Sequence, residues 1–489
     1  FLTYLGGAVL FLAANAMRYN GWENGRLAGH SMGHYLSAAA QAVQATGDED
    51  LAAKLEELIS GLKECQEAAG SFGGSKEGFL FGANVQDASN VEKQFDIVQG
   101  DAQGNTWVPW YNTHKLLQGL VDTYKYTGNA EALEVASNLG DWAYNRVGNW
   151  TAEQQRRACG VEYGGMNDCL YELYKYTHKT EHKEAAHKFD EPDLYKVILS
   201  GNEDTLKGRH SNTTIPKFVG ALNRYVALKE VENVEESDYL EYAEGFWTLV
   251  VEKHAFLTGG TSDMEHFRAD SALDEIRTQC NCESCCAHNM LKLSRGLYQV
   301  TGKKKYADYY ERTLRNAIMG AVNEQGAFSY FTPMATGYYK MFGTADPETN
   351  MFWCCTGTGM ENYTKLADSI YFKSGNSITV NQYVASEVTW KEKNIRLTQN
   401  SDVTASEKAE FTVSLLDGAS PAEAAIRLRI PDWAAGSVTV KINGEAANAA
   451  EEDNYLVVDR AWKNGDKLEM SIPMEVVAYG LPDNDFVYA

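Results

Sequence analysis

The stretch THKLLQGLVDTYKYTGNAEALEVASNLGDWAY, residues 113–144, contains the pattern that decides the fold. Its first half carries small and apolar residues at helical spacing, a short Thr-Gly turn follows, and the second half is a more charged run. Apolar residues that recur with the period of a helix mark the face that packs against the protein interior. The stretch therefore predicts a helical hairpin with an apolar inner helix and an amphipathic outer helix.

The same pattern recurs between about residues 28 and 372, which predicts five hairpins in all. The other four turns and outer helices lie at residues 44–59, 175–189, 235–251 and 299–318. The uncharged opening segment, residues 1–17, and NYTKLADSIYF, residues 362–372, are candidates for a sixth pair that would close a ring.

Repeated helical hairpins assemble either as an open solenoid or as an (α/α)6 barrel. A solenoid usually keeps its connections short, whereas this chain has long loops before its inner helices. These loops are rich in glycine and aromatic residues and lie at residues 103–114, 160–168, 206–216 and 257–267. Loops collected at one end of a barrel would build a site, so the sequence favours the barrel.

After residue 373 the pattern changes to alternation with a period of two. Runs such as SITVNQYVASEVTW and YLVVDRAW alternate apolar and polar residues between turn residues, which predicts antiparallel strands of a β-sandwich. We therefore expect an (α/α)6-barrel catalytic domain over residues 1–372 and a β-sandwich domain over residues 373–489. The abrupt ends of the sequence lead us to expect a gene product that is longer at both termini.

Composition narrows the classes of partner. The formal charge of −23 argues against nucleic acid and anionic membranes. The 28 tyrosines and 10 tryptophans hint at carbohydrate, although core packing accounts for most of them. The opening segment is apolar enough to suggest a membrane or signal sequence, but it lacks an initiator methionine, a basic leader and a cleavage pattern. We read it as a buried helix.

The nine cysteines are unevenly spread. Three are isolated, and we expect plain buried thiols at Cys65, Cys159 and Cys169. The other six form two clusters, CNCESCC at residues 280–286 and CC at residues 354–355. Adjacent cysteines rarely bond to each other, because the disulfide would close a strained ring. The pair is therefore left as buried thiols, halves of two separate disulfides, metal ligands or chemical groups.

A zinc site is the main alternative to disulfides. Zinc takes four ligands from thiolate, imidazole and carboxylate groups, and here six thiols and Glu283 compete for it. Glu283 and Cys285 point to the same side of an extended segment, just before an inner helix expected to begin near Ala287. Cys354 and Cys355 also precede an inner helix, and two facing helix N-termini would lower thiol pKa values around one metal ion. A carboxylate ligand favours a catalytic over a closed structural site.

Several longer stretches resemble one known family. They include ESCCAHNMLKLSRGLYQVTG, FWCCTGTGMENYTKLADSIYF, VPWYNTHKLLQGLVDTY, EYGGMNDCLYELY, GRHSNTTIPKFVGALNRY and TGGTSDMEHF. Together they resemble the β-L-arabinofuranosidases of glycoside hydrolase family 127 and of its close relative, family 146, over nearly the whole chain. The resemblance implies an (α/α)6 barrel followed by β-sandwich domains, a bound zinc ion, and retaining hydrolysis with a cysteine nucleophile.

The resemblance also implies residue roles. The zinc ligands of the family fall on Glu283, Cys285, Cys354 and Cys355, and Cys354 is the nucleophile as well. The general acid/base falls on Glu265. Sugar contacts fall on His114, His210 and Tyr330, with a looser correspondence at Trp22, Glu23 and Asn167. The chain departs from the pattern at Cys286, and Cys280 and Cys282 are extra; we expect packed thiols here rather than a rearranged metal shell.

Each role has a plainer alternative. A glutamate in a loop, such as Glu265, is more often a solvated carboxylate, and its role as an acid would need a pKa raised by a closed, apolar pocket. His114 and His210 each precede an inner helix, where a histidine also serves as a cap or a satisfied core residue. His30 and His34 have the i, i+4 spacing of metal ligands, but no third ligand is nearby, so we read them as pocket or core residues.

The sequence thus predicts a zinc-dependent exo-acting β-L-arabinofuranosidase whose substrate is an arabinofuranosyl oligosaccharide or pectic glycan. Two alternatives remain open: the same machinery acting on another pectic pentofuranoside, and a non-catalytic carbohydrate-binding protein with a structural zinc site. We expect no nucleic acid and no membrane as partner, and a homodimer is possible. Reduced thiolates favour the cytoplasm, and zinc protection would allow the periplasm of a bacterium.

Overall fold

The computed structural model describes residues 20–69, 77–83, 86–87, 89–343, 351–418 and 421–488. The chain divides into two compact units. The first unit comprises residues 1–300, 312–365 and 481–487, and the second comprises residues 301–311, 366–480 and 488–489. Within the described residues, no helix has both the length and the apolar character needed to cross a membrane.

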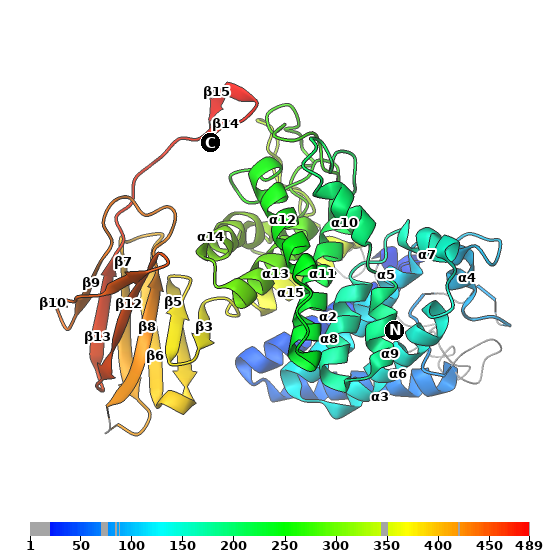
Figure 1. The fold of residues 1–489 in the computed structure, drawn as a ribbon, viewed down its shortest axis with the longest axis horizontal. Coiled ribbons are helices and arrows are strands. Elements are labelled where there is room, and N and C mark those ends of the chain that lie inside the picture. The colour runs from blue at the N-terminus through cyan, green and yellow to red at the C-terminus, as the bar shows by residue number, and fades with distance from the viewer. Residues whose placement is uncertain are drawn as a thin grey trace. The chain divides into compact units, whose positions relative to one another are not determined.

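Figure 1 labels the inner helices of the first unit, and the contacts between them arrange them in a ring. They are α2 (His30–Thr46), α5 (Pro109–Thr127), α8 (Met166–Thr177), α11 (Ser211–Glu232), α13 (Ser284–Thr301) and α15 (Cys354–Thr364). Successive helices from α2 to α11 pack side by side, and α15 packs on α2. Hydrogen bonds from α13 reach α11, through Asn289 and Asn212, and α15, through His288 and Asn362. The ring is therefore complete, as an (α/α)6 barrel requires.

The outer helices follow the predicted hairpins. They are α3 (Glu49–Ala69), α6 (Ala130–Val147), α9 (Thr180–His187), α12 (Ser237–Lys253) and α14 (Lys304–Thr313), of which residues 304–311 belong to the second unit. Shorter helices are α4 (Lys93–Gln99), α7 (Ala152–Cys159), α10 (Pro192–Ile198), η2 (Trp22–Asn24), η3 (Leu314–Ile318), η4 (Met319–Ala321) and η5 (Lys391–Lys393). The predicted buried helix over residues 1–17 lies outside the described residues.

The Thr-Gly turns stop the inner helices. Gly128 ends α5 with φ 74°, in the left-handed region that glycine adopts without steric cost, and its N–H bonds to Tyr124 O. Asn129 then caps α6 by accepting a hydrogen bond from the N–H of Ala132. In the third hairpin, a histidine replaces the glycine, and His178 adopts φ 55°. The turn geometry is thus kept where the sequence departs from Thr-Gly.

The inner helices pack closely because small residues face one another. A Cβ atom on Gly33 of α2 would lie 2.1 Å from the carbonyl oxygen of Lys115 on α5. A Cβ atom on Gly119 of α5 would lie 2.6 Å from the carbonyl oxygen of Gly33. Because glycine has no Cβ atom, these two positions let the backbones of α2 and α5 come into contact.

The second unit is a β-sandwich. One sheet has the order β10-β9-β13-β7-β6-β5 and the other the order β11-β12-β8-β4-β3. Their strands are β3 (Tyr371–Ser374), β4 (Ser377–Val380), β5 (Val384–Trp390), β6 (Ile395–Asp402), β7 (Lys408–Leu415), β8 (Ala422–Arg429), β9 (Thr439–Ile442), β10 (Glu445–Ala446), β11 (Ala450–Glu452), β12 (Tyr455–Trp462) and β13 (Asp466–Ser471). Neighbouring strands pair antiparallel except β4 and β8, which are parallel. One apolar core takes side chains from both sheets.

Two further short sheets complete the description. Strand β1 (Asn20–Gly21) pairs in parallel with β2 (Met351–Phe352), directly before the Cys354–Cys355 pair. Strands β14 (Gly480–Leu481) and β15 (Asn484–Tyr488) form a hairpin, most of which belongs to the first unit. Asp483 in this hairpin accepts hydrogen bonds from the N–H groups of Asp274 and Glu275. The last described residues thus pack near the loop that precedes α13.

Candidate functional site

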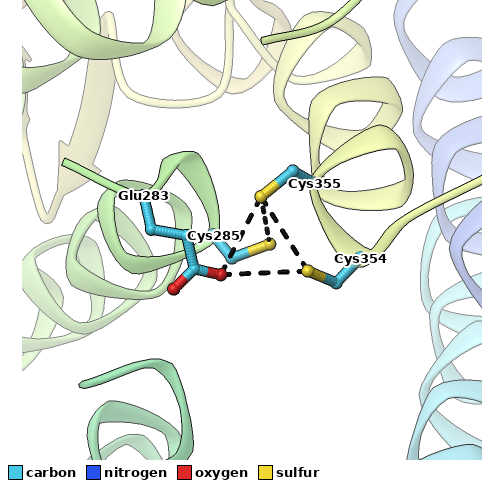
Figure 2. A group of neighbouring side chains, drawn as sticks. All are labelled: Glu283, Cys285, Cys354 and Cys355. Carbon is cyan, nitrogen blue, oxygen red and sulfur yellow. Dashed lines mark hydrogen bonds between the residues drawn. The ribbon is translucent and has the colours of Figure 1, made fainter. Parts of the chain in front are cut away.

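Four residues from two helix N-termini converge in the first unit (Figure 2). Oxygen or sulfur atoms of Glu283, Cys285, Cys354 and Cys355 all lie within 4.8 Å of one another. The Sγ atoms of Cys285 and Cys355 are 3.1 Å apart, and Glu283 Oε1 lies 3.8 Å from the Sγ atoms of both Cys354 and Cys355. Two segments far apart in the sequence therefore supply one cluster.

The local structure differs from the prediction in one detail. Helix α13 begins at Ser284 rather than near Ala287, and α15 begins at Cys354. The cysteines therefore lie in the first helical turn instead of in the segment before it. In the first turn, they are next to N–H groups that have no partner within the helix, which favours negative charge on their sulfur atoms.

The cluster is buried, and burial changes the pKa values of its members. Glu283 and Cys285 are fully buried, and Cys354 and Cys355 are 2% exposed. Burial raises the pKa values of Glu283, Cys285 and Cys354 well above their usual ranges. Burial alone would also raise the pKa of Cys355, but hydrogen bonds from the Cys285 and Cys354 thiols outweigh it and lower that pKa to about 6. Three sulfur donors and one oxygen donor at this spacing are able to hold a metal ion, and they match the ligand types and number that zinc takes.

Tyr330 connects this cluster to Glu265. Its hydroxyl donates a hydrogen bond to Glu265 Oε1 and accepts one from Cys354 Sγ at 3.3 Å. The backbone carbonyl of Tyr330 accepts from the N–H of Ser284 at 3.0 Å, which ties the tyrosine to the start of α13. Tyr330 also packs against the three cysteines together with Trp22. A single side chain thus bridges the carboxylate and one sulfur atom.

Glu265 is held in a strained loop. Ser262, Met264 and Glu265 adopt φ values of 85°, 47° and 66°, in the left-handed region that costs non-glycine residues energy. Backbone hydrogen bonds fix the loop: the N–H of Met264 bonds to Cys280 O, and Glu265 O accepts from the N–H of Ser211. The carboxylate is therefore oriented by contacts to the two segments that carry the other site residues.

The surroundings of Glu265 are not the closed apolar pocket that a raised pKa would need. The Glu265 side chain is 33% exposed, and His210 Nε2 lies 3.5 Å from its Oε2. The hydrogen bond from His210 lowers the pKa of Glu265 more than burial raises it, and the Tyr330 hydroxyl lowers it further. Burial alone would lower the pKa of His210, but the carboxylates of Glu265 and Glu162 raise it. A proton shared by His210 and Glu265 therefore lies preferentially on the imidazole of His210.

The other predicted sugar contacts have different surroundings. The ring of His114 is buried, and neither ring nitrogen has a hydrogen-bond partner among the described residues. Cβ atoms on Gly164 or Gly165 would lie 2.4 and 3.0 Å from this ring. Trp22 packs on the cysteines and makes edge contacts with Trp107 and Trp353.

Glu23 and Asn167 are engaged in structural bonds. Glu23 accepts hydrogen bonds from the N–H groups of Gly29 and Ser31 at the start of α2 and pairs with His30. Asn167 is fully buried and donates to Asp190. No contact in the described part of the chain joins either residue to the cysteine cluster, so their role in sugar binding stays a prediction.

The remaining cysteines and histidines resolve as follows. None of the nine cysteines, all of which lie in the described residues, forms a disulfide, and Cys65, Cys159 and Cys169 are buried as predicted. His30 and His34 are core residues, and His34 Nδ1 pairs with Glu361. Cys286 differs from the expectation of simple packing, because its thiol donates a hydrogen bond to Glu283 Oε2 at 3.3 Å.

Sequence reasoning missed two charged residues near this site. Burial raises the pKa of Glu162, and the charge of His210 partly offsets this. Glu162 lies in the loop of residues 160–168, which the sequence marked for its glycines without singling out the carboxylate. Lys115 lies one residue after His114, and its Nζ atom is 5.0 Å from the centre of the Tyr111 ring.

A family model describes most of the chain. The catalytic domain of the family 127 β-L-arabinofuranosidases matches residues 5–368, and the middle domain of the same family matches residues 377–474. The chain belongs to glycoside hydrolase family 127. This membership agrees with the resemblance seen in the sequence.

Individual members of this family are distant. A non-reducing end β-L-arabinofuranosidase from Bifidobacterium longum subsp. longum is 24% identical over 252 residues, which cover 48% of this chain and 37% of that protein. The match thus spans little more than a third of that relative.

Solved structures of family members share the fold. A family 127 β-L-arabinofuranosidase from Geobacillus stearothermophilus T6 has 16% identity and a TM-score of 0.69, covering 96% of this chain and 75% of that one. A second family 127 β-arabinofuranosidase has 19% identity and the same TM-score, covering 94% and 72% of the two chains. At these identities the likeness establishes the helical barrel followed by β-sheets.

Proposed function

We propose that the protein is a retaining exo-glycoside hydrolase that releases L-arabinose from β-L-arabinofuranosides of plant cell-wall glycans. The observation that carries the proposal is the bridge from Glu265 through the Tyr330 hydroxyl to Cys354 Sγ. A retaining glycosidase needs a nucleophile below the anomeric carbon and an acid at the leaving oxygen. Cys354 and Glu265 are the two groups that the bridge connects.

Glu283, Cys285, Cys354 and Cys355 would hold zinc in this proposal. Zinc bound there would supply positive charge that keeps sulfur as thiolate, which makes Cys354 both a better nucleophile and a better leaving group. The buried donors support this assignment, because three thiols and a carboxylate brought so close together repel one another once they ionise.

Two displacements complete the reaction. In the first, the Cys354 sulfur attacks the anomeric carbon, the bond to the leaving oxygen breaks, and Glu265 gives its proton to that oxygen. In the second, Glu265 takes a proton from water, the water oxygen bonds to the anomeric carbon, and Cys354 leaves as thiolate. Two inversions give net retention, and each atom returns to its starting state.

A lowered pKa leaves Glu265 without the proton that a general acid needs, and His210 is able to supply that proton. The raised pKa of His210 lets the pair carry one proton between the imidazole and the carboxylate. We propose that this proton passes from His210 through Glu265 to the leaving oxygen. Tyr330 and Trp22 are proposed to contact the sugar because they pack against the three cysteines, and His114 is proposed on the family resemblance.

The alternatives differ in what they require of Glu265. Another pectic pentofuranoside would use the same groups, so only a panel of substrates separates that reading. A carbohydrate-binding protein with a structural metal would need no carboxylate linked to one of the ligand sulfur atoms. The Glu265–Tyr330–Cys354 bridge therefore favours catalysis.

The test compares wild type with Glu265→Gln and Cys354→Ser on p-nitrophenyl β-L-arabinofuranoside, with zinc content measured for each. We expect hydrolysis by wild type, a loss of about 100-fold or more in kcat for Glu265→Gln, and no turnover by Cys354→Ser. Glu265→Gln should retain zinc, since Glu265 is not among the ligands. Wild-type inactivity on every pentofuranoside tried, or full activity of either variant, would overturn the proposal.

A further inference from the structure

The thiol of Cys286 hydrogen-bonds one of the two carboxylate oxygens of Glu283. Cys286 is fully buried, one residue after the ligand Cys285, and its Sγ donates to Glu283 Oε2 at 3.3 Å. The other oxygen, Oε1, faces the Sγ atoms of Cys354 and Cys355 at 3.8 Å each. The two oxygens of the carboxylate are thus divided between the thiol of Cys286 and the proposed metal site.

Ser262 extends this arrangement into the loop that carries Glu265. Its Oγ accepts from the N–H of Glu283 at 3.3 Å and hydrogen-bonds the thiol of Cys286. Its carbonyl accepts from the N–H of Cys282 at 3.1 Å. Ser262, Cys286 and Glu283 therefore form a closed set of hydrogen bonds at the start of α13.

A carboxylate without such a partner rotates freely about its last bond and is able to offer one or both oxygens to a metal ion. Partners behind a metal ligand restrict this freedom, and losing one typically weakens metal binding 10- to 100-fold. A buried thiol is a weak donor, but in a site closed to water it has no competitor for the Oε2 lone pairs.

We propose that Cys286 is a positioning residue that fixes Glu283 as a one-oxygen ligand and is not itself a ligand. Its sulfur is not part of the group of donor atoms that lie within 4.8 Å of one another. The inference rests on the zinc site of the proposed function. It gives a role to Cys286, a position at which this chain departs from the family pattern.

The test measures zinc affinity of the purified protein by competition with a chromophoric chelator, for wild type, Cys286→Ala, Cys286→Ser and Cys169→Ala. Cys169 is a matched control, because it is fully buried and its thiol donates to a backbone carbonyl of its own helix, Met166 O. We expect Cys286→Ala to bind zinc 10- to 100-fold more weakly. Cys286→Ser, which keeps a donor, should recover most of the loss, and Cys169→Ala should match wild type.

A second readout separates positioning from ligation. With Co²⁺ in place of zinc, the sulfur-to-cobalt charge-transfer band reports the number of bound thiolates. We expect equal band intensity in wild type and Cys286→Ser. A weaker band in Cys286→Ser, or equal zinc affinity in Cys286→Ala and Cys169→Ala, would overturn the proposal, as would a wild type that binds no zinc. Tight zinc binding by an enzyme inactive on pentofuranosides would instead refute the proposed function alone.

Discussion

Replacing Tyr330 by phenylalanine tests the link between acid and nucleophile with one atom removed. The hydroxyl is the only side-chain group described here that bonds both Glu265 and Cys354. Burial and the surrounding sulfur and carboxylate charges raise the pKa of Tyr330, so it stays protonated and acts as a donor to Glu265. A hydrogen bond to a charged group contributes about 1.5–3 kcal/mol. Taking about 2 kcal/mol, Tyr330→Phe should lose about 30-fold in kcat/KM.

The assay measures kcat and KM on p-nitrophenyl β-L-arabinofuranoside between pH 5 and 9. Zinc content should be unchanged, because Tyr330 is not a ligand. The pH limb governed by Glu265 should move to higher pH, since one of the hydrogen bonds that lower the pKa of Glu265 is gone. Tyr174→Phe is the control: its hydroxyl also donates to a carboxylate, that of Glu232 at 2.7 Å, at the far end of α8. Wild-type kcat/KM in Tyr330→Phe would refute the reasoning.

Three further perturbations concern stability. Arg429→Met should cost about 3–5 kcal/mol in urea unfolding of the second unit, because it removes the buried guanidinium that pairs with the buried carboxylates of Asp308 and Glu311. Burial lowers the pKa of His34 from 6.5 to about 4. The stability gained by burying this neutral imidazole is complete above pH 6.5 and is lost as the pH falls towards 4, because protonation then favours the unfolded chain. This change amounts to about 3 kcal/mol, and unfolding free energies equal at pH 7 and pH 4.5 would contradict it. Removing zinc with a chelator should abolish activity and lower Tm. Where free zinc had been 1,000 times its Kd, the loss in the free energy of unfolding is about 4 kcal/mol. An unchanged Tm would exclude zinc as a stabilising ligand.

The fold was predictable because its signals are local. The Thr-Gly turns and the alternation of apolar and charged helices lie within short stretches, and Gly128 and Asn129 adopt the cap geometry that their residue types favour. The start of α13 was placed three residues late, at Ala287 rather than Ser284, because cysteines carry no strong helix signal. The left-handed conformation of His178 had no sequence signal beyond its place in the hairpin pattern.

The four residues that cluster in the structure could be named from the sequence, but the electrostatics around Glu265 could not. Cys285 and Cys355 are 70 residues apart in the chain, and the sequence brought their clusters together through two facing helix N-termini and through the family resemblance. The sequence indicated only that Glu265 would need a raised pKa to act as an acid; the lowered pKa depends on His210, which the fold brings from the preceding inner helix. Burial of the carboxylate could be anticipated from the sequence, but its pairing with His210 could not.

One short segment of the chain supplies most of the proposed site. Residues 262–286 contain Ser262, which hydrogen-bonds Cys286, the carboxylate Glu265 and the proposed ligands Glu283 and Cys285, while α15 adds the other two sulfur atoms. Backbone bonds between Ser262 and Cys282, and between Met264 and Cys280, fasten the two ends of this segment together. A change that moves the proposed metal ligands should therefore move Glu265 as well. Because Tyr330 bonds both Ser284 and Glu265, the distance from the acid to Cys354 is set by the same segment that would bind the metal.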